Sequence, residues 1–184
     1  MGRMVCFMQE RTLSTSNAFS GRLLTLDIVE VELGTGERAE REIVRHPGAA
    51  VVLAQLDDGR FVFVRQYRKA IERLLLEVVA GTLEPGEDPE ACAMRELVEE
   101  TGHPARTLER LGTVYPAPGY TEECLHVYFA RIETAQVERN LDDDERIDVV
   151  YLTQHEIDKM IASAEIEDAK TLSAWMLYKS RVVA

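Results

Sequence analysis

The chain has 184 residues, of which 46% are hydrophobic and 29% are charged. This length favours a single domain with a substantial buried core. The formal net charge of −12 argues against a broad basic surface, so we expect neither nucleic acid nor an anionic membrane as a partner. An acidic protein that handles an anionic ligand needs metal cations or local arginines at its site.

The compartment follows from what the sequence does not contain. No apolar run approaches the length of a membrane span, and the apolar start Val5–Met8 is too short for a secretory signal. The three cysteines and four histidines show no metal-ligand spacing. We therefore expect a cytoplasmic protein.

The first quarter of the chain divides into two parts. Residues 1–18 are polar and unpatterned, and we expect a flexible N-terminal arm. Residues 19–48 are expected to form an antiparallel β-meander. In this part, Arg22–Leu33 alternates polar and apolar side chains, Gly34-Thr-Gly36 is typical of a hairpin turn, and Arg41–Arg45 would return.

Residues 49–184 are expected to form the main domain. Strands are predicted at residues 49–56, 61–67, 74–79, about 107–115, 123–132 and 146–152, with helices at 154–162 and about 168–181. A capping box at Thr153 and Glu156 opens the first of these helices. Because strands dominate and helices lie in the middle and at the end, the pattern predicts an α+β sandwich.

A further helix is predicted between Asp88 and Gly102. Asp88 is a typical N-cap, and Pro89 suits the first helical position, where its missing N–H would have no partner. Gly102 suits the left-handed residue that ends a helix. An apolar surface for docking the helix on a sheet is expected from the apolar residues Ala91, Met94, Leu97 and Val98.

Three glutamates can share one face of this helix. Glu96 and Glu100 are four residues apart, and Glu99 is three from Glu96. Hard cations such as Mg²⁺ bind carboxylate oxygens and complete their coordination with water and substrate phosphates. The alternative is a solvated acidic face, but this does not explain the joint occurrence of loop, cap, arginine and carboxylates.

The segment Gly81–Gly102 resembles the signature of the Nudix hydrolases, enzymes that cleave nucleoside diphosphates linked to another moiety. The positions that carry the resemblance are Gly81, Glu87, Arg95, Glu96, Glu99, Glu100 and Gly102. One position departs: His103 follows the last glycine, where the family usually has an aliphatic residue. The resemblance implies an α/β/α sandwich with a mixed sheet, plus the N-terminal meander.

Three further stretches, residues 21–49, 64–68 and 115–122, resemble the ADP-ribose pyrophosphatase branch, so the resemblance covers roughly residues 19–180. It implies hydrolysis of ADP-ribose to AMP and ribose 5-phosphate with Mg²⁺ or Mn²⁺. It also implies a homodimer that pairs through the meander. The alternative is a monomer in which these strands form an ordinary hairpin at the edge of a sheet. The implied substrate-binding residues are Arg45, Arg68 or else Arg65, Pro118 and Gly119.

The resemblance also assigns roles at the site. Glu96 and Glu100 would be the main metal ligands, with Glu99 and the backbone carbonyl of Ala80 as further ones. Glu145 would be the general base, with Asp143 as the second choice. Arg95 would pair with the glutamates, and Glu87 would brace the loop. The implied catalytic residues are Glu145, Glu99 and Arg95.

Other interpretations of the same residues stay open. A nucleotide-sugar or other dinucleotide pyrophosphatase would use the same helix, because specificity lies in loops. A different class of function is also possible for these residues: a non-catalytic module that senses ADP-ribose. Pro118-Gly119 is also typical of a simple turn. The acidic residues 142–145 are also typical of a solvated loop.

Overall fold

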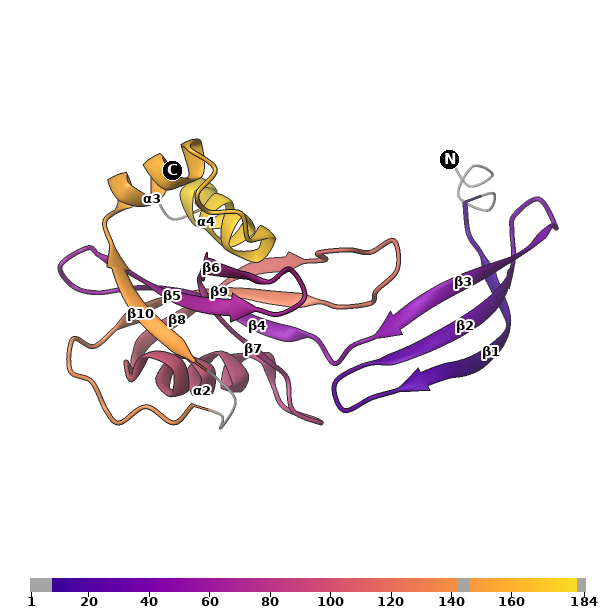
Figure 1. Cartoon of the computed structure of the whole chain (residues 1–184), viewed down its shortest axis with the longest axis horizontal. Coiled ribbons are helices and arrows are strands. Elements are labelled where there is room, and N and C mark those ends of the chain that lie inside the picture. The colour runs from indigo at the N-terminus through magenta and orange to yellow at the C-terminus, as the bar shows by residue number, and fades with distance from the viewer. Residues whose placement is uncertain (1–7, 142–145, 182–184) are drawn as a thin grey trace. The chain divides into compact units, whose positions relative to one another are not determined.

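The computed structural model describes residues 8–141 and 146–181 (Figure 1). The chain divides into two compact units. The first contains the residues up to Pro47 together with Ala117–Glu123, and the second contains the rest. Within the described residues, no helix has both the length and the apolar character needed to cross a membrane.

The first unit is a three-stranded antiparallel sheet. β2 (Thr25–Glu32) lies between β1 (Arg11–Ser20) and β3 (Arg38–Arg45). The predicted alternation in β2 has a physical effect, because Val29 and Val31, two residues apart on one face, are both buried. The sheet therefore has the meander arrangement that the sequence predicted for this part of the chain.

β1 departs from the flexible arm expected over residues 1–18. From Arg11 onward the chain pairs antiparallel with β2, with irregularities between Thr12 and Ser14 and between Asn17 and Phe19. The side chains of β1 are almost all exposed, so the strand has no hydrophobic alternation to reveal it. This strand is held by backbone hydrogen bonds to β2, which do not show in the pattern of apolar residues.

The second unit contains a seven-stranded mixed sheet. Its main path has the order β10-β5-β4-β9-β8, while β6 pairs with β5 and β7 pairs with β4. β4 and β9 run parallel and the other pairs are antiparallel. The strands are β4 (Ala49–Gln55), β5 (Phe61–Arg68), β6 (Arg73–Glu77), β7 (Val79–Thr82), β8 (Ala105–Val114), β9 (Leu125–Ile132) and β10 (Ile147–Leu152).

Helices cover both faces of this sheet, as Figure 1 shows. α2 (Pro89–Thr101) covers one face, and α3 (Gln154–Ala162) and α4 (Ala169–Arg181) cover the other. β4 is buried along its whole length, because its alternate residues pack in one cluster with Leu97 of α2 and in another with Trp175 of α4. The predicted α+β class and α/β/α sandwich are confirmed.

One predicted strand, residues 74–79, is two strands in the structure. The break falls at Val78, whose backbone N–H donates to Thr171 Oγ1 at 2.9 Å instead of to a neighbouring strand. β6 pairs with β5, whereas β7 pairs with β4. The chain thus changes partner within the sheet just before Gly81.

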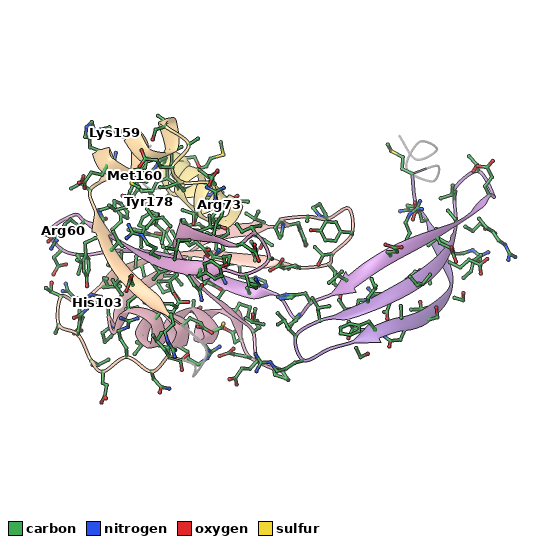
Figure 2. The ribbon with its side chains drawn as sticks, viewed as in Figure 1. Arg60, Arg73, His103, Lys159, Met160 and Tyr178 are labelled. Atoms are coloured by element: carbon green, nitrogen blue, oxygen red, sulfur yellow. The ribbon has the colours of Figure 1, made fainter. Side chains whose placement is uncertain are left out.

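His103 is better accommodated than its departure from the signature suggested. It follows α2, is labelled in Figure 2, and is 2% exposed. Its ring nitrogens lie 2.8 Å from the Glu133 carbonyl oxygen and 2.9 Å from the Tyr151 hydroxyl. Gln136 Nε2 lies 3.1 Å from His103 Nε2 and donates to the Tyr151 hydroxyl at 3.0 Å. Hydrogen bonds around the buried His103 ring therefore replace the aliphatic contact.

Replacing His103 by leucine should lower the free energy of unfolding by about 1–3 kcal/mol, because the Glu133 carbonyl and the Tyr151 hydroxyl lose their hydrogen bonds to the ring. Urea denaturation measures this change. Tyr151→Phe, which removes one partner and keeps the ring, is the matched control and should cost less. A leucine variant as stable as the wild type would show that these hydrogen bonds do not stabilise the fold.

Candidate functional site

The helix α2 has the ends that the sequence predicted. Asp88 Oδ1 accepts a hydrogen bond from the Glu90 N–H at 2.9 Å, and Pro89 occupies the first turn. Gly102 has a left-handed backbone with φ 74°, and its N–H donates to the Val98 carbonyl at 2.7 Å. Both ends are fixed by residues within four positions, so the glutamates between them sit on a well-defined helix.

The packing face of α2 differs from the expected one. Cys92, Ala93 and Leu97 are buried in one cluster with the sheet, whereas Ala91 is exposed and Met94 is 44% exposed. The expectation for Ala91 and Met94 was wrong, because the hydrophobic pattern alone did not show which side of the helix meets the sheet.

Glu100 lies on the packing side of the helix. It is three residues from Leu97, which places the two on one face, and it is 3% exposed. Glu96 and Glu99 have side chains that are 14% and 30% exposed. These three glutamates are therefore buried or half-buried, which rules out a solvated acidic face for them.

Arg95 joins α2 to the loop before it. Its Nε and Nη2 donate to the two carboxylate oxygens of Glu87, each at 2.9 Å. Its Nη1 donates to Glu96 Oε1 at 2.6 Å and to Glu99 Oε2 at 2.9 Å. Nη2 also donates to the Thr82 carbonyl at 3.4 Å. The predicted pairing of Arg95 with the glutamates is present, and its pairing with Glu87 is an additional contact. We call Arg95, Glu87, Glu96 and Glu99 the arginine bracket.

The arginine bracket changes the acidity of its members. Hydrogen bonding to Arg95 lowers the pKa of Glu87 from its ordinary 4.5 to about 2. Hydrogen bonding to Glu87 in turn raises the pKa of Arg95. The Glu84 backbone N–H also donates to Glu87 Oε2 at 2.9 Å. Glu87 is therefore ionised far below neutral pH.

Gly81 allows the glutamate helix to approach the sheet. A Cβ added at Gly81 would lie 1.8 Å from Cδ of Glu96 and 1.9 Å from its Oε1. No real side chain fits at this distance, so the carboxylate of Glu96 lies directly against the backbone of β7. The carbonyl of Ala80 belongs to the same strand, one residue before Gly81.

These groups can be tested for their fit to a divalent cation. In the described ranges, 8–141 and 146–181, no three histidine, cysteine, aspartate or glutamate side chains are gathered as a ready metal site. Mg²⁺ commonly uses only one or two carboxylates and takes its other oxygens from water and phosphate. The hard oxygen donors on α2 and the close approach at Gly81 suit such a partial site.

The structure separates the two arginine candidates of β5. Val62 and Val64 pack in the cluster that contains α2, and the period of two along a strand places Arg68 on that same face. Arg68 donates to both oxygens of Glu77, at 2.8 Å and 2.6 Å. Arg65 is exposed and belongs to the opposite face. The geometry therefore favours Arg68, the first choice.

Two members of this neighbourhood were not found from the sequence. Glu77 is 1% exposed and accepts from both Arg68 and Lys170. The two partners of Glu77 come from β5 and from the first turn of α4. Glu77 is the last residue of β6 and Lys170 is 93 residues away, so no local spacing could have indicated the pair.

The remaining substrate candidates belong to the first unit. Arg45 donates to Asp27 Oδ2 at 3.0 Å and to Glu122 Oε2 at 2.6 Å, and it lines a hollow of about 340 Å³. Pro118 and Gly119 form a turn that the Tyr120 N–H closes on the Ala117 carbonyl. The predicted general base Glu145 and its alternative Asp143 lie outside the described residues.

Replacing Glu87 by glutamine should lower the free energy of unfolding by about 2 kcal/mol above about pH 5, because a bidentate charged pair is lost. Below pH 4.5 the unfolded wild type takes up a proton that the folded state refuses until about pH 2. The stability gap between wild type and variant should therefore shrink as the pH falls from about 4.5 towards 2.

Urea denaturation at several pH values between about 3 and 7 measures this gap. Glu84→Gln, at an exposed position of the same loop, is the matched control and should show no such gap. A gap that stays constant below pH 4.5 would contradict the role given to the arginine bracket.

Comparison with known proteins agrees with this geometry. The ADP-ribose pyrophosphatase of Bacillus subtilis is 42% identical over 168 residues, which cover 91% of each chain. The methanol dehydrogenase activator of Bacillus methanolicus is 41% identical and covers 95% of this chain and 93% of that protein. A crystal structure of an ADP compounds hydrolase shares the fold, with a TM-score of 0.83, 24% identity and 96% of each chain covered. The NUDIX domain profile matches residues 44–175, and the chain belongs to the Nudix family.

Proposed function

We propose that this Nudix protein hydrolyses the diphosphate of ADP-ribose to AMP and ribose 5-phosphate, acting in the cytoplasm as a homodimer. The observation that carries the proposal is the arginine bracket, which holds Glu96 and Glu99 of α2 while Glu96 lies against the backbone at Gly81. The substrate rests on the relative from Bacillus subtilis, which is named for ADP-ribose and matches nine-tenths of both chains.

Mg²⁺ or Mn²⁺ would be held by Glu96 and Glu100. Glu99 and the carbonyl of Ala80 would be further donors, and all four offer the hard oxygen ligands that these ions prefer. When bound, the metal supplies an activated water and neutralises charge that develops on the phosphoryl oxygens. The protein's part is to keep these donors on one rigid helix end and against one strand.

The need for cations follows from electrostatics. Two carboxylates about 5 Å apart repel by about 3 kcal/mol at an effective dielectric constant near 20. An anionic diphosphate beside them makes the repulsion larger. Arg95 offsets part of this repulsion within the protein, but its guanidinium is already engaged by Glu87, Glu96 and Glu99. Substrate binding therefore depends on added positive charge.

In the reaction, the oxygen of water bonds to one phosphorus while the bond from that phosphorus to the bridging oxygen breaks. Each product keeps one phosphate, and the water proton passes to a base, for which Glu145 is our first choice and Asp143 the second. Arg68 would bind the phosphates through a bidentate contact. Arg45 and the Pro118-Gly119 turn would contact the nucleotide.

Glu100→Gln should lower turnover by about 10²–10⁴-fold at saturating Mg²⁺, because it removes a ligand charge while keeping size and helix propensity. Steady-state kinetics measure the effect, and thermal unfolding confirms that the variant folds. Glu90→Gln, an exposed position in the first turn of the same helix, is the matched control and should keep wild-type turnover. Full activity of the Glu100 variant would remove this residue from the ligand set.

A substrate panel tests the choice of ADP-ribose. We expect the value of kcat/KM for ADP-ribose to exceed those for a nucleotide sugar, a dinucleoside polyphosphate and a nucleoside triphosphate by at least about tenfold, the scale of one lost polar contact. Product analysis in ¹⁸O-water also shows which phosphorus is attacked. A preference for triphosphates would overturn the substrate, and tight binding of ADP-ribose without turnover would indicate a sensing module instead.

A further inference from the structure

Glu77 is a buried carboxylate that the arginine bracket does not hold. Its side chain is 1% exposed at the end of β6. Arg68 donates to both of its oxygens, and Lys170 donates to Oε2. Burial alone raises the pKa of Glu77, but hydrogen bonds from Arg68 and the charge of Lys170 outweigh this and lower it below its ordinary value. Glu77 is therefore an ionised group in the interior.

Lys170 occupies an unusual position for a cation. It lies in the first turn of α4 (Ala169–Arg181), where the helix dipole disfavours positive charge. Its side chain is only 15% exposed and donates to Asp168 Oδ1 at 3.0 Å as well as to Glu77. The carboxylates of Glu77 and Asp168 thus neutralise the two cations Arg68 and Lys170. The contact with Glu77 explains why a lysine is tolerated at this helix end.

The cluster of Glu77, Arg68 and Lys170 is not well explained by a contribution to the stability of the fold. A buried ion pair is often no more stabilising than apolar residues of similar size, because desolvation opposes the attraction. A bidentate contact, however, fixes the plane and direction of a guanidinium. What Glu77 clearly provides is a single orientation for Arg68, whose side chain is still 40% exposed.

Arg68 also interacts electrostatically with Glu100 of α2. Hydrogen bonding to Glu77 is the largest cause of the raised pKa of Arg68, and the negative charge of Glu100 adds to it. Only Nε and one N–H of Nη2 bind Glu77, and a guanidinium has five N–H donors. Arg68 therefore keeps donors for an anion while its Glu77 edge is fixed.

We propose that Glu77, supported by Lys170 from the opposite layer of the sandwich, is a positioning residue that holds the guanidinium of Arg68 for the substrate diphosphate. This inference rests on the proposed function, since it concerns the same substrate. Holding the side chain before binding reduces the conformational entropy lost when the substrate arrives. Glu77 then acts through Arg68 and does not itself touch the substrate.

A double-mutant cycle on kcat/KM tests this. Arg68→Met should lower kcat/KM for ADP-ribose by about 100-fold and Glu77→Gln by about tenfold, mainly through KM, as expected for charged hydrogen bonds. If Glu77 acts through Arg68, the double variant should be no worse than Arg68→Met alone. Glu77→Asp, which keeps the charge, should recover part of the loss.

Three results would overturn the inference. In the double variant, the losses of kcat/KM from the two single variants could multiply, which would show that Glu77 acts independently of Arg68. Arg68→Met could leave kcat/KM unchanged. Glu77→Gln could lower the unfolding midpoint without changing KM, as expected for the control Asp158→Asn. That control removes the charge that pairs with Lys179 and weakens the hydrogen bond from Trp175, so it concerns the same helix α4.

A second cycle covers the case in which Glu77→Gln does not fold. Lys170→Met keeps the pair of Glu77 and Arg68, so it should raise KM by about threefold in the wild type and not at all in the Arg68→Met background. An equal rise in both backgrounds would overturn the inference. If the wild type prefers another diphosphate to ADP-ribose, the proposed substrate fails, while either cycle, run on that preferred compound, still decides the role of Glu77.

Discussion

A single guanidinium holds three acidic side chains of α2 and the loop before it in place. Arg95 contacts Glu87 on the loop and Glu96 and Glu99 on the helix. Without this charge, three carboxylates would share a half-buried surface, where repulsion is larger than in water. The arginine thus allows three carboxylates to lie close together on the helix and its preceding loop.

The close approach of helix and strand depends on a change of strand partner. Residues up to Glu77 pair with β5, and residues from Val79 pair with β4. The hydrogen bond from Val78 to Thr171 takes up the backbone N–H at the break. This change brings Gly81 under Glu96, where any side chain on the strand would collide with the carboxylate. The glycine and the strand break therefore act together.

The features that the sequence predicted are those with local causes. The ends of α2 depend on Asp88, Pro89 and Gly102, each within four residues of the groups that it satisfies. The arginine bracket also lies within one loop and one helix. Spacing along the chain is then nearly the same as spacing in the fold, and for this reason the signature was informative about geometry as well as about family.

The features that the sequence did not predict have distant causes. The period of two along β5 puts Arg65 and Arg68 on opposite faces, but the sequence does not show which of these faces α2 covers. In the same way, Met94 was expected against the sheet and lies 44% exposed. The pair of Glu77 and Lys170 spans 93 residues and two layers. β1 shows a further limit, since its strand comes from backbone pairing with exposed side chains.

Arginine bracing and metal binding at the same glutamates are compatible. A carboxylate has two oxygens and about four acceptor positions. Arg95 bonds to Oε1 of Glu96 and to Oε2 of Glu99, which is one oxygen of each residue. The second oxygen of each belongs to a side chain whose rotamer the arginine already restricts. If these glutamates hold a cation as proposed, the conformational entropy of their side chains is already largely lost on folding, so less of it opposes the binding of the cation and its diphosphate.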